Sequence, residues 1–266
     1  MHPILFRIGA GVVPSYGFFL TLGYLISLAL VLRLSRKQGL SVKEMAALAL
    51  FGMAVSILGG KLYLFIGRAV RNPDALVRDP MRLLTMSDGG GGFYGGLIAG
   101  LFFALWYLHR YRLPVWKAAD VLGTGTALGY AVMKLGCFMG GCCYGRPSGL
   151  PWAVRFPGFP GPVHPTQLYE AGLNIFNFIV LYRLLGRKKF DGQVIALDVF
   201  INSSVRFLVE YFRGDPGRGF IIRGASPWTS LSTPQLISLT ALGAGVSLYV
   251  VLARKNREAA PGGEPA

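Results

Sequence analysis

Charged side chains stand in this chain at places where long apolar runs would be expected to carry none. Lys61, Lys134 and Arg206 each lie inside such a run. A charge at membrane depth costs several kcal/mol unless it is paired, reaches the headgroups or meets a ligand. Three converging cations therefore indicate a functional site rather than three side chains that reach the headgroups independently.

Segment 134–170 holds the densest group of reactive residue types. It begins at Lys134, contains all three cysteines, and ends in His-Pro-Thr-Gln-Leu-Tyr-Glu at residues 164 to 170. Cations with a few acids near lipid suit a phosphorylated headgroup, because Arg offers a planar fork to phosphate oxygens and Lys a point charge. We expect one layer near the outer leaflet that contains Tyr16, Lys61, Tyr94, Lys134, His164, Glu170, Arg206, Glu210 and Arg213.

The cysteines Cys137, Cys142 and Cys143 admit three explanations. Cys137 could form a disulfide with Cys142 or Cys143, or all three could be small buried apolar residues. Together with His164 they also have the ligand types of a zinc site. Adjacent cysteines chelate poorly, so we expect no metal and no cofactor.

The remaining chain predicts an all-α, polytopic membrane protein. Of its 266 residues, 53% are hydrophobic and only 15% are charged, which is too apolar for a soluble domain of this size. A helix that crosses the bilayer needs about 20 apolar residues. Seven segments approach that length: 16–32, 45–66, 93–108, 118–138, 168–185, 194–212 and 235–252.

The basic residues predict the orientation. The formal net charge is +15, and the basic residues lie mostly in short loops, as topology signals facing anionic lipid do, so we expect no nucleic-acid partner. The N-terminus is then outside and the C-terminus cytoplasmic. We assign residues 1–257 to one transmembrane domain and residues 258–266 to a disordered tail.

Two local patterns refine this arrangement. Asp198, Asn202, Arg206 and Glu210 recur every four residues, so one face of the sixth helix is polar and must point into the bundle. Four glycines, at positions 89 to 92 after Asp88, favour a hinge or a close backbone approach over a phosphate cradle.

Four stretches of the chain resemble the phosphatidylglycerol–prolipoprotein diacylglyceryl transferase family. Residues 93–98 are similar to its F-H-G-G-L-I motif, and residues 134–146 to R-I-G-N-F-x-N-x-E-x-x-G-R. Residues 164–170 resemble H-P-(S/T)-Q-L-Y-E, and residues 206–213 resemble R-F-x-x-E-F-x-R. The resemblance implies seven helices in the bacterial inner membrane, with phosphatidylglycerol and the signal region of a prolipoprotein as substrates.

The resemblance also implies roles for single residues. A lipobox cysteine thiol would displace glycerol phosphate from the lipid and form a thioether. Arg206, Lys134 and Arg146 would hold the phosphate, Tyr94 or His164 would take part in proton transfer, and Glu210 would orient Arg206. The other residues expected at the substrate are Gly145, Arg213, Tyr16, Lys61 and Glu170.

Several positions depart from the family pattern. Tyr94 replaces a histidine and Lys134 an arginine, while Cys137 and Gly140 replace asparagines and Cys142 a glutamate. Two alternatives stay open: transfer of lipid to another acceptor, with one of the chain's own cysteines taking part, and a non-catalytic phospholipid-binding membrane protein.

Overall fold

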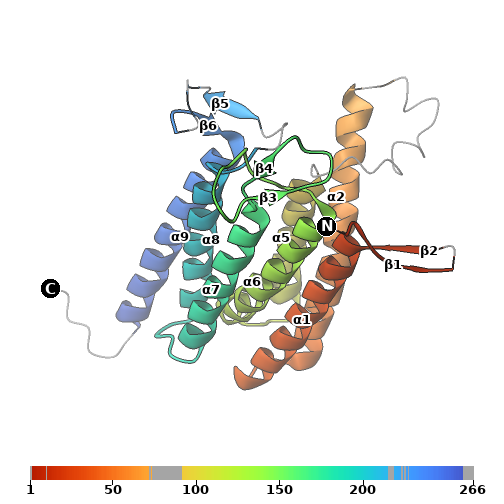
Figure 1. The fold of residues 1–266 in the computed structure, drawn as a ribbon. Coiled ribbons are helices and arrows are strands. Elements are labelled where there is room, and N and C mark those ends of the chain that lie inside the picture. The colour runs from red at the N-terminus through yellow and green to blue at the C-terminus, as the bar shows by residue number, and fades with distance from the viewer. Residues whose placement is uncertain are drawn as a thin grey trace. The chain divides into compact units, whose positions relative to one another are not determined.

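The computed structural model describes residues 2–9, 11–71, 73, 92–214, 219–222, 224, 226 and 228–259. The chain divides into two units, one formed by Met1–Val31 with Ala119–Ala266 and the other by Leu32–Ala118. Seven helices and three strand pairs are found in the described residues (Figure 1).

The smaller unit is built around α2 (Val42–Arg71) and α5 (Gly92–Arg110). Glycines let their backbones meet: a Cβ added at Gly60 would lie 2.8 Å from the carbonyl oxygen of Gly92, and one at Gly95 would lie 2.7 Å from that of Gly59. Small residues at helix contacts are typical of membrane proteins. Gly92 thus makes the close approach expected for the glycine run, whereas Asp88 and positions 89–91 lie outside the described residues.

The larger unit contains most of α1 (Ser15–Lys37) and α6 (Val115–Gly140), with α7 (Thr166–Leu185), α8 (Gln193–Glu210) and α9 (Thr233–Glu258). Two helix starts are marked by their caps: Pro165 is the N-cap residue of α7, and α9 begins at Thr233 after an N-cap at Ser232. Ser232 and Gln235 form a capping box, which satisfies donors that the first turn would leave unpaired.

Each expected apolar segment corresponds to one of these helices, with small differences at the ends. The sixth segment was expected to reach residue 212, but α8 ends at Glu210 because the following backbone bonds elsewhere: Arg146 N donates to Phe212 O at 2.8 Å. Glu258, expected in the tail, is the last residue of α9, and residues 260–266 lie outside the described residues.

Five helices, α1, α2, α6, α7 and α9, are long and apolar enough to cross a membrane. Helix α8 carries Asp198, Arg206 and Glu210 within 18 residues, so its sequence is less apolar. Large side chains on α2 are strongly exposed, including Phe51 and Leu58 at 60% and 66%. The described structure is that of a predominantly helical membrane protein.

Three short antiparallel strand pairs accompany the helices, and the structure remains consistent with the expected all-α class. They are β1 (Ile4–Ile8) with β2 (Gly11–Pro14), β3 (Val154–Arg155) with β4 (Pro162–Val163), and β5 (Phe220–Ile222) with β6 (Leu231–Ser232). Strands of two to five residues leave no apolar run that a sequence can reveal. The pairs β3–β4 and β5–β6 lie at the end of the larger unit where α7 and α9 begin and α8 ends (Figure 1).

A buried ion pair joins α6 to the loop before α8, near the opposite end of the larger unit. Asp120 is fully buried and accepts hydrogen bonds from Lys188 Nζ at 2.8 Å and from the backbone N–H groups of Gly192 and Ile195, both at 2.9 Å. Lys188 also contacts Asp191 at 2.7 Å. These bonds satisfy both Asp120 oxygens and fix the start of α8 against α6.

Candidate active site

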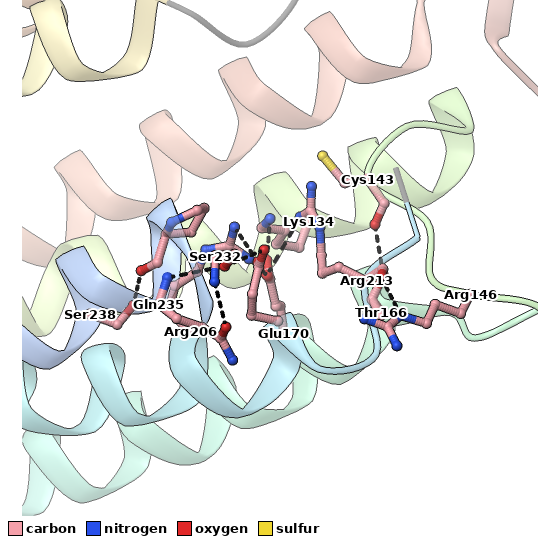
Figure 2. Close-up of polar contacts among 12 residues, drawn as sticks. Lys134, Cys143, Arg146, Thr166, Glu170, Arg206, Arg213, Ser232, Gln235 and Ser238 are labelled. Carbon is pink, nitrogen blue, oxygen red and sulfur yellow. Dashed lines mark hydrogen bonds and ion pairs between the residues drawn. The ribbon is translucent and has the colours of Figure 1, made fainter. Parts of the chain in front are cut away.

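A single buried carboxylate in the larger unit is contacted by three cationic side chains. Glu170 lies near the start of α7 and is 2% exposed. Its Oε2 forms an ion pair with Lys134 Nζ of α6, and its Oε1 lies 3.2 Å from Arg206 Nη1 of α8. Arg213, just beyond α8, approaches Oε1 at 3.9 Å (Figure 2). The expected convergence of Lys134, Glu170, Arg206 and Arg213 is therefore present in the structure.

A second carboxylate positions the most exposed of these cations. Arg206 Nη2 lies 2.9 Å from Glu210 Oε2, one helical turn further along α8. Ser232 donates to the other Glu210 oxygen at 3.0 Å, so the N-cap of α9 fixes this acid (Figure 2). Glu210 is 2% exposed, whereas the Arg206 side chain is 30% exposed. The guanidinium is thus held on its inner side and remains accessible on its outer side.

The charge balance of this group favours an anion. Three cations, Lys134, Arg206 and Arg213, surround two carboxylates. Buried charges are tolerated when they are paired and hydrogen-bonded, and among the ion pairs of the described residues in this group three cations meet two acids. Arg supplies a bidentate fork, so the accessible face of Arg206 is suited to phosphate oxygens.

The backbone around Gly145 links this group to the loop before α7. Gly145 N donates to His164 O at 2.9 Å, and His164 N donates to Arg146 O at 2.9 Å. A Cβ at Gly145 would lie 2.6 Å from His164 O and 2.7 Å from Phe212 O, so any side chain there would collide with two backbone segments. The requirement for Gly145 is therefore steric. Arg146 is anchored through Nε, which donates to Arg213 O at 2.9 Å.

His164 lies beside Arg146, and its side chain makes contacts of its own. Its Nδ1 is 3.2 Å from Tyr169 Oη, which in turn accepts a hydrogen bond from Trp152 Nε1 at 2.8 Å. Burial lowers the pKa of His164, and the positive charge of Arg146 lowers it further. The imidazole is thus neutral at pH 7 and able to accept a proton.

Of the three remaining expected site residues, one lies beside Lys134 and two belong to the other unit. Tyr16 is in the first turn of α1 and packs on the end of α6, where a Cβ at Gly136 would lie 3.4 Å from Tyr16 Cα. It interacts electrostatically with Lys134 and with the three cysteines. Lys61 and Tyr94 belong to the smaller unit, on α2 and α5, and both side chains are exposed. Their participation in the site stays a prediction.

The polar face of α8 points inward, as its four-residue spacing predicted. Asp198 is 7% exposed and accepts hydrogen bonds from Asn177 Nδ2 at 2.7 Å and Asn202 Nδ2 at 2.9 Å. This arrangement is an interhelix network that joins α7 to α8. Asp198 and Asn202 therefore have a structural explanation that does not involve a substrate.

All three cysteines are free thiols, so neither of the disulfides considered above is formed. The Sγ atoms of Cys137, Cys142 and Cys143 lie within 4.8 Å of one another. His164, considered as a fourth ligand, is not part of this cluster. The loop is fastened to α7, where Thr166 Oγ1 donates to Cys143 O at 2.7 Å and Gln167 Nε2 to Cys142 O at 2.6 Å.

Sequence reasoning missed two residues at the centre of the site. Tyr130 donates to Glu170 Oε2 at 3.2 Å and lies one turn before Lys134, whose Nζ is 5.1 Å from the Tyr130 ring centroid. Ser232 contacts Glu210, as described above. The four-residue spacing of Tyr130 and Lys134 was a usable signal. For Ser232 the sequence offered a helix cap but no sign of its contact with Glu210.

Comparison with known proteins places the chain in a family. A family model described as prolipoprotein diacylglyceryl transferase matches residues 3–251. The chain is 34% identical to a Clostridium tetani protein and 33% identical to a Bordetella parapertussis protein, each named phosphatidylglycerol–prolipoprotein diacylglyceryl transferase. The first alignment covers 94% of this chain and 97% of its relative, and the second covers 96% of each. A Geobacter sulfurreducens protein of the same name is 29% identical over 96% of this chain and 97% of its own length. This chain belongs to the prolipoprotein diacylglyceryl transferase family.

Proposed function

We propose that this protein transfers a diacylglyceryl group from phosphatidylglycerol to the cysteine thiol of a prolipoprotein. The observation that carries the proposal is the buried Glu170 with its three cations, of which Arg206 keeps an exposed face. The names of the full-length relatives state the same donor and the same class of acceptor.

The reaction defines what these cations have to do. The acceptor sulfur forms a bond to the glyceryl carbon, and the bond from that carbon to the phosphate oxygen breaks. Glycerol phosphate leaves with the bonding electron pair, and the thiol proton passes to a base. Cations placed at the leaving phosphate stabilise the charge that develops in the transition state, which lowers the barrier.

We assign the phosphate to Arg206, with Lys134 and Arg146 as further cations and Arg213 adding to the positive field. Glu210 orients Arg206 through the ion pair at 2.9 Å. Lys134 retains the charge of the family's arginine but presents one ammonium group instead of a planar fork. Lys134 contacts Oε2 of Glu170, and Arg206 contacts Oε1 of the same carboxylate. With lysine at position 134, both cations therefore still pair with Glu170.

His164 is the better supported proton acceptor of the two considered. Its lowered pKa keeps the imidazole neutral at pH 7, and it adjoins Arg146, which we place at the phosphate. A tyrosine has an unperturbed pKa of about 10 and is a weak base at neutral pH. Tyr94, Tyr16 and Lys61 are proposed to contact the lipid or the acceptor.

We also propose the cellular setting. The seven helices lie in the bacterial inner membrane with the N-terminus outside, so that the Glu170 end of the bundle faces the outer leaflet. The apolar surface of α2 and the five helices long enough to span a bilayer support a multi-pass arrangement.

Complementation tests the proposal. The chain is expressed in bacteria depleted of their own diacylglyceryl transferase, and thioether-lipidated lipoprotein is followed by mass spectrometry. We expect rescue by the wild-type chain and by Arg183→Ala, a matched control on the exposed last turn of α7, but not by Arg206→Ala. Failure of a folded, membrane-inserted wild-type chain would reject the proposal in favour of another acceptor or a binding role.

A further inference from the structure

The three thiols form a compact donor set next to the cations described above. Cys137 lies in the last turn of α6 and is buried, whereas Cys142 is exposed and Cys143 half-buried in the following loop. Their three Sγ atoms lie within 4.8 Å of one another, and each offers one sulfur ligand. No other group of three His, Cys, Asp or Glu side chains converges in this way among the described residues.

The loop backbone is held in the conformation that brings these thiols together. Adjacent side chains of an extended segment point to opposite sides, so two consecutive cysteines do not normally face one partner. Cys143 adopts a left-handed backbone conformation with φ +62°, which is uncommon for a residue other than glycine. Such a conformation costs about 1 kcal/mol or more and persists where surrounding contacts fix it.

Side chains of α7 provide these contacts. Thr166 donates to the carbonyl of Cys143, and Gln167 donates to the carbonyl of Cys142 (Figure 2 shows the first). Both donors are essentially inaccessible to solvent, at 1% and 0% exposure. In addition, Cys142 N donates to Cys137 O at 3.1 Å, which ties the loop back to the end of α6. The convergence of the sulfurs is therefore built into the fold.

Two cations lie close enough to the loop to offset the charge of a metal–thiolate group. Lys134 and Arg213 both interact electrostatically with Cys143. Three thiolates around a divalent ion leave a net negative charge, which these neighbouring cations would offset. A sulfur cluster in an uncharged apolar loop would lack this compensation.

We propose that Cys137, Cys142 and Cys143 form a binding site for a thiophilic closed-shell metal ion of the Zn²⁺ class. A Zn–S bond of about 2.3 Å puts the sulfurs of a tetrahedral site about 3.8 Å apart, so the cluster has to contract by at most about 1 Å. Three sulfurs leave one coordination position, and the exposure of Cys142 opens that position to an external ligand. Such a site with an open position differs from closed structural zinc sites. The proposal does not depend on the transferase reaction.

Thr166 and Gln167 would then act as residues that orient the ligands from outside the coordination sphere. Partners of this kind typically change metal affinity by about 10- to 100-fold. The proposed site therefore predicts two sizes of effect on metal affinity. Loss of a sulfur ligand should weaken metal binding more than loss of a supporting hydrogen bond.

Metal binding can be measured on the full-length protein, purified in detergent, reduced and freed of metal. Zn²⁺ is titrated in competition with a chromophoric chelator, and X-ray absorption at the zinc edge counts the sulfur ligands. We expect one ion per chain with three sulfurs, protection of all three thiols from alkylation, and affinity at least about 100-fold lower in Cys143→Ser. Thr166→Val should weaken binding about 10-fold, and His109→Asn, a control on an exposed α5 residue, should not change it.

Three outcomes would overturn the site. The first is unchanged Zn²⁺ affinity in a folded Cys143→Ser protein, and the second is a zinc absorption spectrum with fewer than three sulfur neighbours in the wild-type protein. The third is a disulfide between any two of the cysteines in protein trapped by alkylation directly from cells, because it removes two ligands. The spectrum of the wild-type protein decides the matter even if every variant misfolds.

Discussion

Two buried acids of the larger unit are surrounded by similar chemistry yet perform different tasks. Asp120 and Glu170 each receive cations from a neighbouring segment, and each is at most 2% exposed. Asp120 is balanced by one lysine and two backbone N–H groups, and Lys188 is further paired with Asp191. Glu170 is contacted by three cations and by Tyr130.

The difference shows how a structural ion pair can be distinguished from a binding site. The Asp120 group is closed, because its cation is 10% exposed and is satisfied by two acids. The Glu170 group is open, because the Arg206 side chain is 30% exposed and keeps an accessible face. Asp120 lies on α6, and Glu170 pairs with Lys134 of the same helix, 14 residues further along. At a rise of 1.5 Å per residue, the two groups are about 21 Å apart along α6. A substitution should therefore affect stability at one end and catalysis at the other.

The largest effect is expected for Arg206→Ala. Loss of a group that stabilises transition-state charge typically lowers the rate by about 100- to 1,000-fold. We expect the rate of diacylglyceryl transfer to fall by this factor, while the helical content of the protein stays unchanged. Arg206→Lys keeps the positive charge but lacks the planar guanidinium group, so its transfer rate should lie between those of Arg206→Ala and the wild type. Transfer to a prolipoprotein peptide in detergent, followed by mass spectrometry, gives both rates. An Arg206→Ala rate within about twofold of wild type would contradict the assignment.

Asp120→Asn should show the opposite behaviour. Removing one partner of a buried ion pair leaves the other charge uncompensated, which destabilises by about 3 kcal/mol. We expect a lower midpoint in denaturant unfolding, with the transfer rate per folded molecule unchanged within about twofold. A large loss of rate in the folded fraction would mean that the Asp120 group also takes part in the reaction.

The backbone that supports the Glu170 group can be tested with two glycines, one at the end of α6 and one in the loop that follows. Gly145→Ala should destabilise by about 1 to 3 kcal/mol, because its Cβ would meet two carbonyl oxygens at under 3 Å. Gly140→Ala is the matched control: its Cβ would lie 3.6 Å from Tyr16 Cβ, which is an ordinary contact. Thermal unfolding in detergent compares the two variants, and equal midpoints would refute this account of Gly145.

The smallest effect concerns His164 and pH. Its folded pKa lies below the ordinary value of 6.5, so the unfolded chain takes up the proton first as the pH falls. The contribution of His164 to stability is complete above pH 6.5 and is lost as the pH falls from there towards the folded pKa. We expect the Tm of the His164→Asn protein to decline less between pH 7 and pH 5.5 than the Tm of the wild-type protein. An identical decline in both proteins would show that other groups cause it.

Much of the scaffold follows from local sequence. Apolar run length placed all seven helices to within a few residues, because membrane helices depend on local composition. The four-residue spacing on α8 predicted the buried face, and the cost of unpaired charge predicted that Lys134, Arg206 and Glu170 meet.

The rest depended on contacts between distant segments. Nothing local to Ser232 indicates its bond to Glu210, 22 residues earlier. The convergence of the cysteines requires the left-handed conformation of Cys143 and two side chains of α7, and sequence spacing alone argued against it. The strands of the pair β3–β4 are two residues long, and Val163 of β4 also bridges to Pro147, which no apolar run in the sequence indicates.

The central claim is that the open Glu170 group holds the phosphate that leaves during transfer. The direct measurement counts glycerol phosphate released and thioether formed by the purified protein from phosphatidylglycerol vesicles and a prolipoprotein peptide. For the wild type and for folded Asp120→Asn, we predict that the amount of glycerol phosphate released equals the amount of thioether formed. For Arg206→Ala we predict neither product within the same time. Release of glycerol phosphate without thioether, or full transfer by Arg206→Ala, would contradict the claim.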